Sequence, residues 1–225
     1  MTFLEIARGI HISAGFVALA TFWLPMLVKK GGRLHRRVGW VYVGAMAIVA
    51  VTALAICVYR VGFTEDADRR QSSIFLFYVA LLSATSASMG VRVLRAKQRT
   101  AAHRSAFDLG LPACLVLAGL GLLGYGVHLG AVLFMSFAPV GIFVGGGQLF
   151  YWLRPPQTKM HWWFEHMGGM VGSSIATLTA FLVVNAGRIG LARFGLVVWL
   201  VPTLIGVPGL RLWQRHYRAK FERKG

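Results

Sequence analysis

The sequence predicts an all-α, polytopic bundle of about seven transmembrane helices, and two observations support this fold class. The chain of 225 residues is 56% hydrophobic and only 14% charged, which is too apolar for a soluble domain of this length. Apolar runs long enough to cross roughly 30 Å of hydrocarbon as helices recur along the chain. They lie at about 9–28, 39–59, 73–94, 107–127, 130–153, 162–185 and 191–213, so we expect one transmembrane domain over residues 1–225.

Each run has its own signals in the sequence. The first follows Arg8 and lacks a polar cleavage region after the Ala-Leu-Ala at 18–20, which favours an uncleaved span over a signal peptide. The second follows the basic segment "KKGGRLHRRVGW", and the third follows the acidic loop "FTEDADRRQ". The fourth and sixth spans are rich in glycine and serine, which permits close helix packing. The seventh ends in a basic tail, residues 214–225.

The distribution of cations predicts the orientation, because short basic loops stay cytoplasmic. Most of the 24 lysines and arginines lie in the loops after the first, third and fifth spans and in the tail. We therefore expect an outer N-terminus and a cytoplasmic C-terminus. The net charge of +17 indicates anionic lipid head groups, and a possible membrane protein partner, rather than nucleic acid, since the cations lie between apolar runs.

Histidines and carboxylates recur where the chain re-enters the membrane from these basic loops. His35, His103 and His161 each occupy one loop, and His166 follows one turn into the sixth span. Only two of the seven acidic residues share this level, Asp108 and Glu165. Ionisable groups at membrane depth tend to face the bundle interior. We therefore expect a shared cytoplasmic-side site formed by His35, His103, Asp108, His161, Glu165 and His166.

The chemistry of this set suits a metal or haem. Imidazole with carboxylate suits zinc or iron, and two imidazoles suit haem iron. His35, His103 and His166 form the first group of candidate haem ligands. His11 and His128, both at the outer level, form a second candidate pair. The competing interpretation is structural: histidines beside arginines are ordinary interfacial groups, and carboxylates complement helix N-termini.

One stretch resembles a known family. The first span contains His11, Gly15, Ala18 and Leu19, and the following segment reads Lys30-Gly-Gly-x-x-His35-Arg36-x-x-Gly39-x-x-Tyr42, with Met46 one place late. This pattern, with Ala101–Arg104, is similar to a family of uncharacterised bacterial integral membrane proteins. The resemblance implies a bacterial cytoplasmic-membrane location and transfers no reaction.

These observations favour a protein that binds haem or a metal for electron transfer or cofactor handling. One alternative is a membrane-embedded metal hydrolase, for which His161, Glu165 and His166 offer the spacing H-x-x-x-E-H. The other is a transporter or a non-catalytic subunit whose basic face docks a partner. Whether the protein is an enzyme is left open by the sequence.

Overall fold

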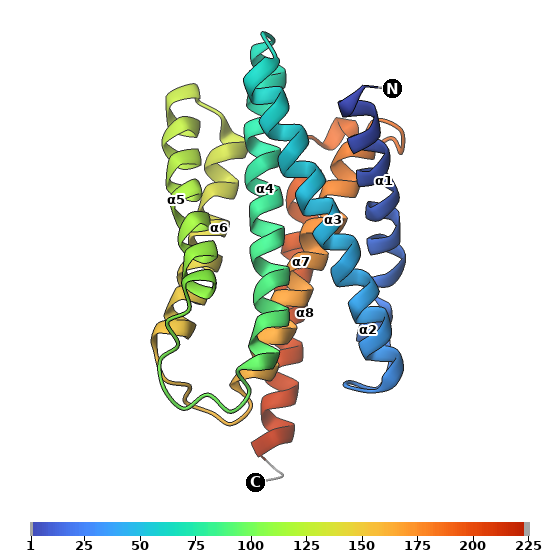
Figure 1. Ribbon diagram of the computed structural model, residues 1–225. Coiled ribbons are helices and arrows are strands. Elements are labelled where there is room, and N and C mark those ends of the chain that lie inside the picture. The colour runs from blue at the N-terminus through green and yellow to red at the C-terminus, as the bar shows by residue number, and fades with distance from the viewer. Residues whose placement is uncertain (1, 223–225) are drawn as a thin grey trace.

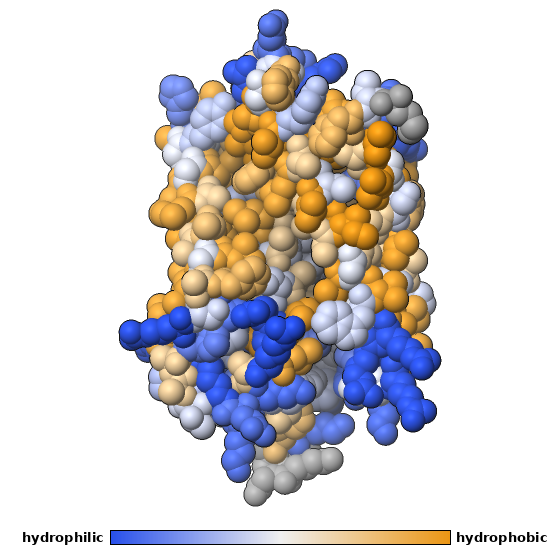
Figure 2. Space-filling model, in the orientation of Figure 1, coloured by the Kyte–Doolittle hydropathy of each residue, from blue (hydrophilic) through white to orange (hydrophobic). Residues whose placement is uncertain are grey.

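The computed structural model describes residues 2–222 as an all-helical bundle (Figure 1). Within this range seven helices are long and apolar enough to cross a membrane. Figure 2 shows the matching apolar band, with hydrophilic residues at both ends and most of them at the end where α8 terminates. The elements are α1 (Phe3–Thr21), α2 (Leu24–Leu27), α3 (Arg33–Phe63), α4 (Ala67–Arg92), η1 (Val93–Arg95), α5 (Ala106–Leu129), α6 (Val132–Leu153), α7 (His161–Asn185), η2 (Ala192–Phe194) and α8 (Leu196–Glu222).

The seven predicted runs correspond one to one with these helices, so a multi-pass membrane fold is confirmed. Several helices are longer than the runs, because polar residues continue the backbone hydrogen bonding beyond the apolar band. α8 continues to Glu222, so residues 214–222 of the basic tail extend the last helix. α4 already begins at Ala67, and only three residues of the acidic segment lie between α3 and α4.

Two helices organise the bundle. α4 and α7 pack against each other along the middle, with α3 beside α4 and α8 beside α7. α1 packs on α3, and the hairpin of α5 and α6 packs on α4, so these two pairs lie on opposite sides of the centre (Figure 1). The main apolar core joins α4 to α5 and α6 through Phe75, Leu115 and Phe137.

Glycine brings α4 and α7 into close contact. A methyl group on Gly169 would lie 2.6 Å from the backbone nitrogen of Gly90 and 2.6 Å from the Ser86 carbonyl oxygen. Such a separation is far below van der Waals contact, so the two backbones can meet here only because neither residue has a Cβ that intervenes. This contact sets the position of the first turn of α7 relative to the end of α4.

Tyr78 ties α4 to α6 where proline interrupts the latter. Pro139 lacks an N–H and disturbs the backbone hydrogen bonds around it. The Tyr78 hydroxyl accepts from the Gly141 N–H at 2.9 Å and donates to the Ala138 carbonyl at 2.9 Å. One side chain from the neighbouring helix therefore hydrogen-bonds to the α6 backbone on both sides of the proline.

The first span is broken near its basic end. α1 ends at Thr21, and the four-residue helix α2, with Pro25 in its first turn, completes the crossing. Gly31 then adopts a left-handed conformation, with φ of 73°, which allows the chain to turn into α3. The short helix leaves carbonyl groups without partners in its own backbone, and these carbonyls contribute to the site described next.

Candidate cofactor cavity at the basic end

A cavity of about 340 Å³ opens at the basic end of the bundle, between the α1–α2–α3 segment and α4, α7 and α8. Its walls are mostly apolar and aromatic, and its polar groups are few. A volume of this size is in the range of small-molecule sites. The residues that matter below are His35, Tyr42 and Trp40 from α3, Lys30 and Met26 from the preceding segment, His166, Trp163 and Met170 from α7, and Trp213 from α8.

His35 is held by the carbonyl groups at the end of the broken first span. Its Nδ1 lies 3.1 Å from the Pro25 carbonyl oxygen. Lys30 donates to the same oxygen at 3.0 Å and also to the Met26 and Val28 carbonyls. Burial lowers the pKa of the Lys30 ammonium below its ordinary value. The histidine and the ammonium therefore share one acceptor, which fixes the loop and the ring together.

His166 is held by the close contact of α4 with α7. Its Nδ1 lies 2.6 Å from the carbonyl oxygen of Gly90, the residue that meets Gly169. About two turns along α7 from His166, Tyr42 from α3 contacts Ser173 through a hydroxyl–hydroxyl bond of 2.8 Å. α3, α4 and α7 thus jointly determine where the His166 ring points.

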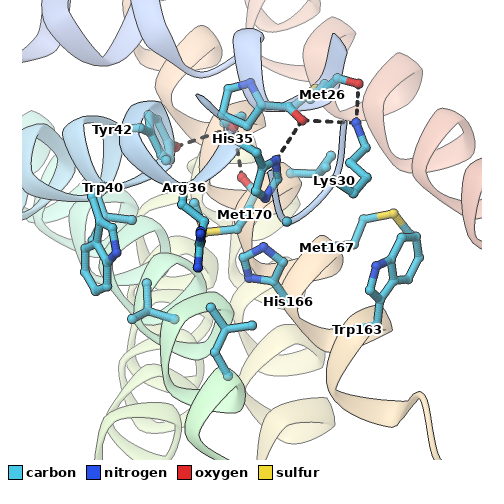
Figure 3. A pocket seen from close by; sticks show the side chains of 18 of the residues that line it. Met26, Lys30, His35, Arg36, Trp40, Tyr42, Trp163, His166, Met167 and Met170 are labelled. Atoms are coloured by element: carbon cyan, nitrogen blue, oxygen red, sulfur yellow. Dashed lines mark hydrogen bonds between the residues drawn. The ribbon is translucent and has the colours of Figure 1, made fainter. Parts of the chain in front are cut away.

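The two rings lie next to each other in the cavity, with centroids 6.2 Å apart (Figure 3). A carbonyl oxygen can only accept, so in both residues Nδ1 carries the proton and a neutral ring keeps its lone pair on Nε2. This pattern, in which Nδ1–H donates to a carbonyl and Nε2 is left to coordinate, is the one that protein-bound metals use. The pair therefore has the chemistry of two nitrogen ligands.

Cationic side chains lie at the edge of the cavity, and two of them make cation–π contacts with tryptophans of the cavity wall. The Lys30 ammonium lies 5.0 Å from the Trp213 ring centroid, and the Lys97 ammonium lies 4.5 Å from that of Trp162. Arg36 lies on the side of His35 opposite Lys30 in Figure 3. An apolar interior with a cationic edge suits a flat, amphipathic ligand that carries negative charge.

His103 and Asp108 lie in a different cluster, at the start of α5. Asp108 is 5% exposed and receives hydrogen bonds from Arg92 Nε at 2.5 Å, Arg92 Nη2 at 2.7 Å and His103 Nε2 at 2.8 Å. The bidentate guanidinium neutralises the carboxylate and fixes α5 to the end of α4. This arrangement matches the structural interpretation of the two residues.

His161 and Glu165 have further partners of their own. His161 Nδ1 bonds the Tyr151 hydroxyl at 2.7 Å, whereas its buried Nε2 has no partner among the described residues. Glu165 is half-buried, and the cations whose charges act on it are Arg211, Arg218 and Arg99. The six residues expected in one site are thus distributed over several clusters, and residues 2–222 contain no group of three or more His, Cys, Asp or Glu arranged to hold a metal ion.

The outer pair also separates. His11 Nδ1 lies 3.0 Å from the Thr52 hydroxyl across the contact of α1 with α3. His128 is exposed near the end of α5. α1 and α5 lie on opposite sides of α3 and α4 in Figure 1, so the two histidines do not face a common space.

The sequence did not indicate the full wall of the cavity. Trp40, Trp162 and Trp163 are typical interfacial anchors in a sequence, yet all three line the cavity together with Met170 and Trp213. The signal that could have found them is their level: each lies within about two turns of a histidine-bearing basic loop. Which face of its helix each occupies depends on tertiary packing.

Comparisons with known proteins add no relative. No family model, no curated protein and no solved structure matches the chain. The similarity of residues 11–46 to a bacterial membrane family therefore stays a resemblance, and any function for this chain has to rest on the geometry and chemistry of its own residues.

Proposed function

We propose that the protein binds haem at the basic end of the bundle, where His35 and His166 would hold it, and serves electron transfer or haem handling. The observation that carries the proposal is the pairing of two imidazoles 6.2 Å apart, each with Nδ1 engaged by a backbone carbonyl. Haem would supply one-electron chemistry when bound. The carbonyls of Pro25 and Gly90 orient the two imidazoles, and the apolar lining of the cavity would surround the bound group.

The lining and the charge of the cavity suit this ligand. If both imidazoles held one metal ion through Nε2, two bonds of about 2 Å would be compatible with ring centroids roughly 6 Å apart. The aromatic and methionine walls suit an apolar macrocycle, and Lys30, Arg36 and Lys97 at the cavity suit its carboxylate groups. Tyr42 and Ser174 add hydroxyl groups at the inner wall.

The other two functions have less support. In the hydrolase alternative His161 and Glu165 would share an ion and His166 would need another partner, yet residues 2–222 contain no group of three or more His, Cys, Asp or Glu arranged to hold a metal ion. A transporter or partner-docking role requires no imidazole pair at all. A metal ion bound by the same two histidines, with Met170 beside them, is the nearest variant of the haem proposal, and elemental analysis distinguishes the two.

The orientation belongs to the proposal as well. We place the basic end in the cytoplasm of a bacterial cell, because short basic loops resist translocation. A periplasmic reporter fused at Glu65, between α3 and α4, should be active, and one fused after residue 225 should be inactive. The reverse pattern would move the cavity to the outer face.

Absorption spectra test haem binding directly. The protein, purified in detergent with haem supplied, should show a Soret band, and the His35→Ala and His166→Ala variants should each shift or lose it. His128→Ala and His216→Ala are the matched controls, since each also removes a helical histidine, both are exposed, and neither lines the cavity.

The outcomes separate the alternatives. Loss of the band in the two cavity variants with retention in the controls supports the proposal. Bound copper, iron or zinc without a Soret band, lost in the same variants, assigns the pair to a metal ion. A spectrum and metal content that are indifferent to His35 and His166 would show that the pair ligates neither.

A further inference from the structure

A second pocket at the same end, on the side of the α5–α6 hairpin, has the charge of an anion site. It measures about 320 Å³ and is lined by Arg92, Arg95, Ala96, Gln98, Arg99, His103 and Asp108. Three guanidinium groups therefore face one carboxylate, and that carboxylate is already shared by Arg92 and His103. The pocket keeps a surplus of positive charge.

The fixed part of this surplus comes from Arg99. Its Nη1 donates to the Trp152 and Arg154 carbonyls at 3.3 Å and 2.7 Å, and its Nη2 to the Tyr151 carbonyl at 2.9 Å. Carbonyl groups orient a guanidinium without neutralising it. Arg99 also lies over the Tyr151 ring at 4.5 Å, so its positive charge is held at one place on the pocket wall.

Several donors remain for a ligand. Arg92 uses Nε and Nη2 on Asp108, which leaves its Nη1 group. Arg95 and Gln98 are exposed. The pocket also adjoins the first turn of the 24-residue helix α5, where the Ser105 side chain makes no capping bond within the described structure. Helix N-termini attract anions through their free N–H groups.

We propose that this pocket binds a phosphate group, most readily the phosphodiester of an anionic phospholipid. Phosphate accepts several hydrogen bonds at once and matches clustered guanidinium groups. The lipid source is favoured by Phe107, which is 55% exposed and lies 5.0 Å from the Arg92 guanidinium carbon, so an apolar surface for an acyl chain begins beside the cations. Basic pockets between membrane helices bind such head groups.

Lipid retention measured by native mass spectrometry tests the site, with phosphatidylglycerol added to the purified protein in neutral detergent. The variant carries Arg95→Gln with Gln98→Glu, which removes one cation and adds a carboxylate without touching the Arg92–Asp108 pair. Arg37→Gln is the control, because Arg37 is exposed at the same end outside the pocket. We expect roughly tenfold weaker retention in the pocket variant and little change in the control.

Competition identifies the source of the phosphate. Displacement of the lipid by excess inorganic phosphate would assign the site to free phosphate compounds as well, whereas persistence of the lipid would assign it to phospholipid. Equal retention in the pocket variant and the Arg37 control, with or without a small common loss, would overturn the proposal, because general attraction to a basic surface would then account for all binding.

Discussion

The basic end of the bundle has two histidine-containing clusters, and the histidines of the two clusters have different kinds of partner. On the α5 side, Arg92 and His103 each donate hydrogen bonds to the buried carboxylate of Asp108. In the cavity, His35 and His166 lie next to each other, and the Nδ1 of each forms a hydrogen bond with a neutral backbone carbonyl. The first cluster has its charges compensated internally, whereas the second keeps two nitrogen atoms for a ligand.

This difference teaches how to separate structural from functional histidines at membrane level. A histidine that donates to a buried carboxylate helps to satisfy a charge that the fold must compensate, since a lone charge in this position is costly. A histidine oriented by a carbonyl toward another histidine contributes little to folding. The two clusters should therefore respond oppositely to substitution: the first in stability, the second in binding.

Asp108→Asn should give the largest loss of stability. It leaves the guanidinium of Arg92, whose side chain is 30% exposed, without its counter-charge, and removing one member of a buried pair costs on the order of 3 kcal/mol. His35→Ala loses one hydrogen bond of a half-buried ring and should cost about 1 kcal/mol. Equilibrium unfolding of the ligand-free protein in detergent compares the two. If His35→Ala proved as costly as Asp108→Asn, the distinction between the clusters would fail.

Gly169→Ala should have an intermediate effect and should reach the cavity. The added methyl group would meet the Gly90 backbone at 2.6 Å, so α7 must move away from α4 at a cost of about 2 kcal/mol. The bond from His166 to the Gly90 carbonyl should then weaken, and cofactor affinity should fall with it.

Gly168→Ala is the matched control for that change. Its methyl group would meet only Gln214 Nε2, at 3.8 Å, which is ordinary contact, and alanine is better than glycine inside a helix by up to about 1 kcal/mol. We expect unchanged or slightly raised stability and an unaltered absorption spectrum. Similar losses in both variants would mean that the α4–α7 contact does not position His166.

The fold was largely predictable from the sequence, because lipid requires long apolar helices and these leave a direct record in composition. The pairing of His35 with His166 was also within reach, since the loops after the odd-numbered spans must meet at one end. The pairing of Asp108 with Arg92 was not predictable from the sequence. Arg92 lies sixteen residues earlier on another helix, and only the packing of α4 with α5 brings the two residues together. The role of Pro25 depends on a break in the first span that the apolar pattern conceals.

Lys30 offers the smallest and most specific test of how the cavity is held. Burial lowers the pKa of its ammonium in the folded protein from the ordinary value of 10.5. Below the lowered value both folded and unfolded chains carry the proton, so this group adds no slope to the pH dependence. Between the lowered value and 10.5 the side chain of Lys30 binds more protons in the unfolded chain, so its contribution to the free energy of unfolding should rise with pH. Lys30→Gln should abolish this rise.

The matched control is Lys29→Gln, since Lys29 is exposed in the same loop and its loss should leave the rise in place. Unfolding curves between neutral pH and 10.5 measure it, with His35→Ala as a third variant. His35→Ala should keep the rise, because Lys30 retains the Pro25, Met26 and Val28 carbonyls when the imidazole is gone. A rise that survives in Lys30→Gln would place its origin elsewhere in the chain. The ammonium that shares an acceptor with His35 would then play no measurable part in setting the stability of the cavity.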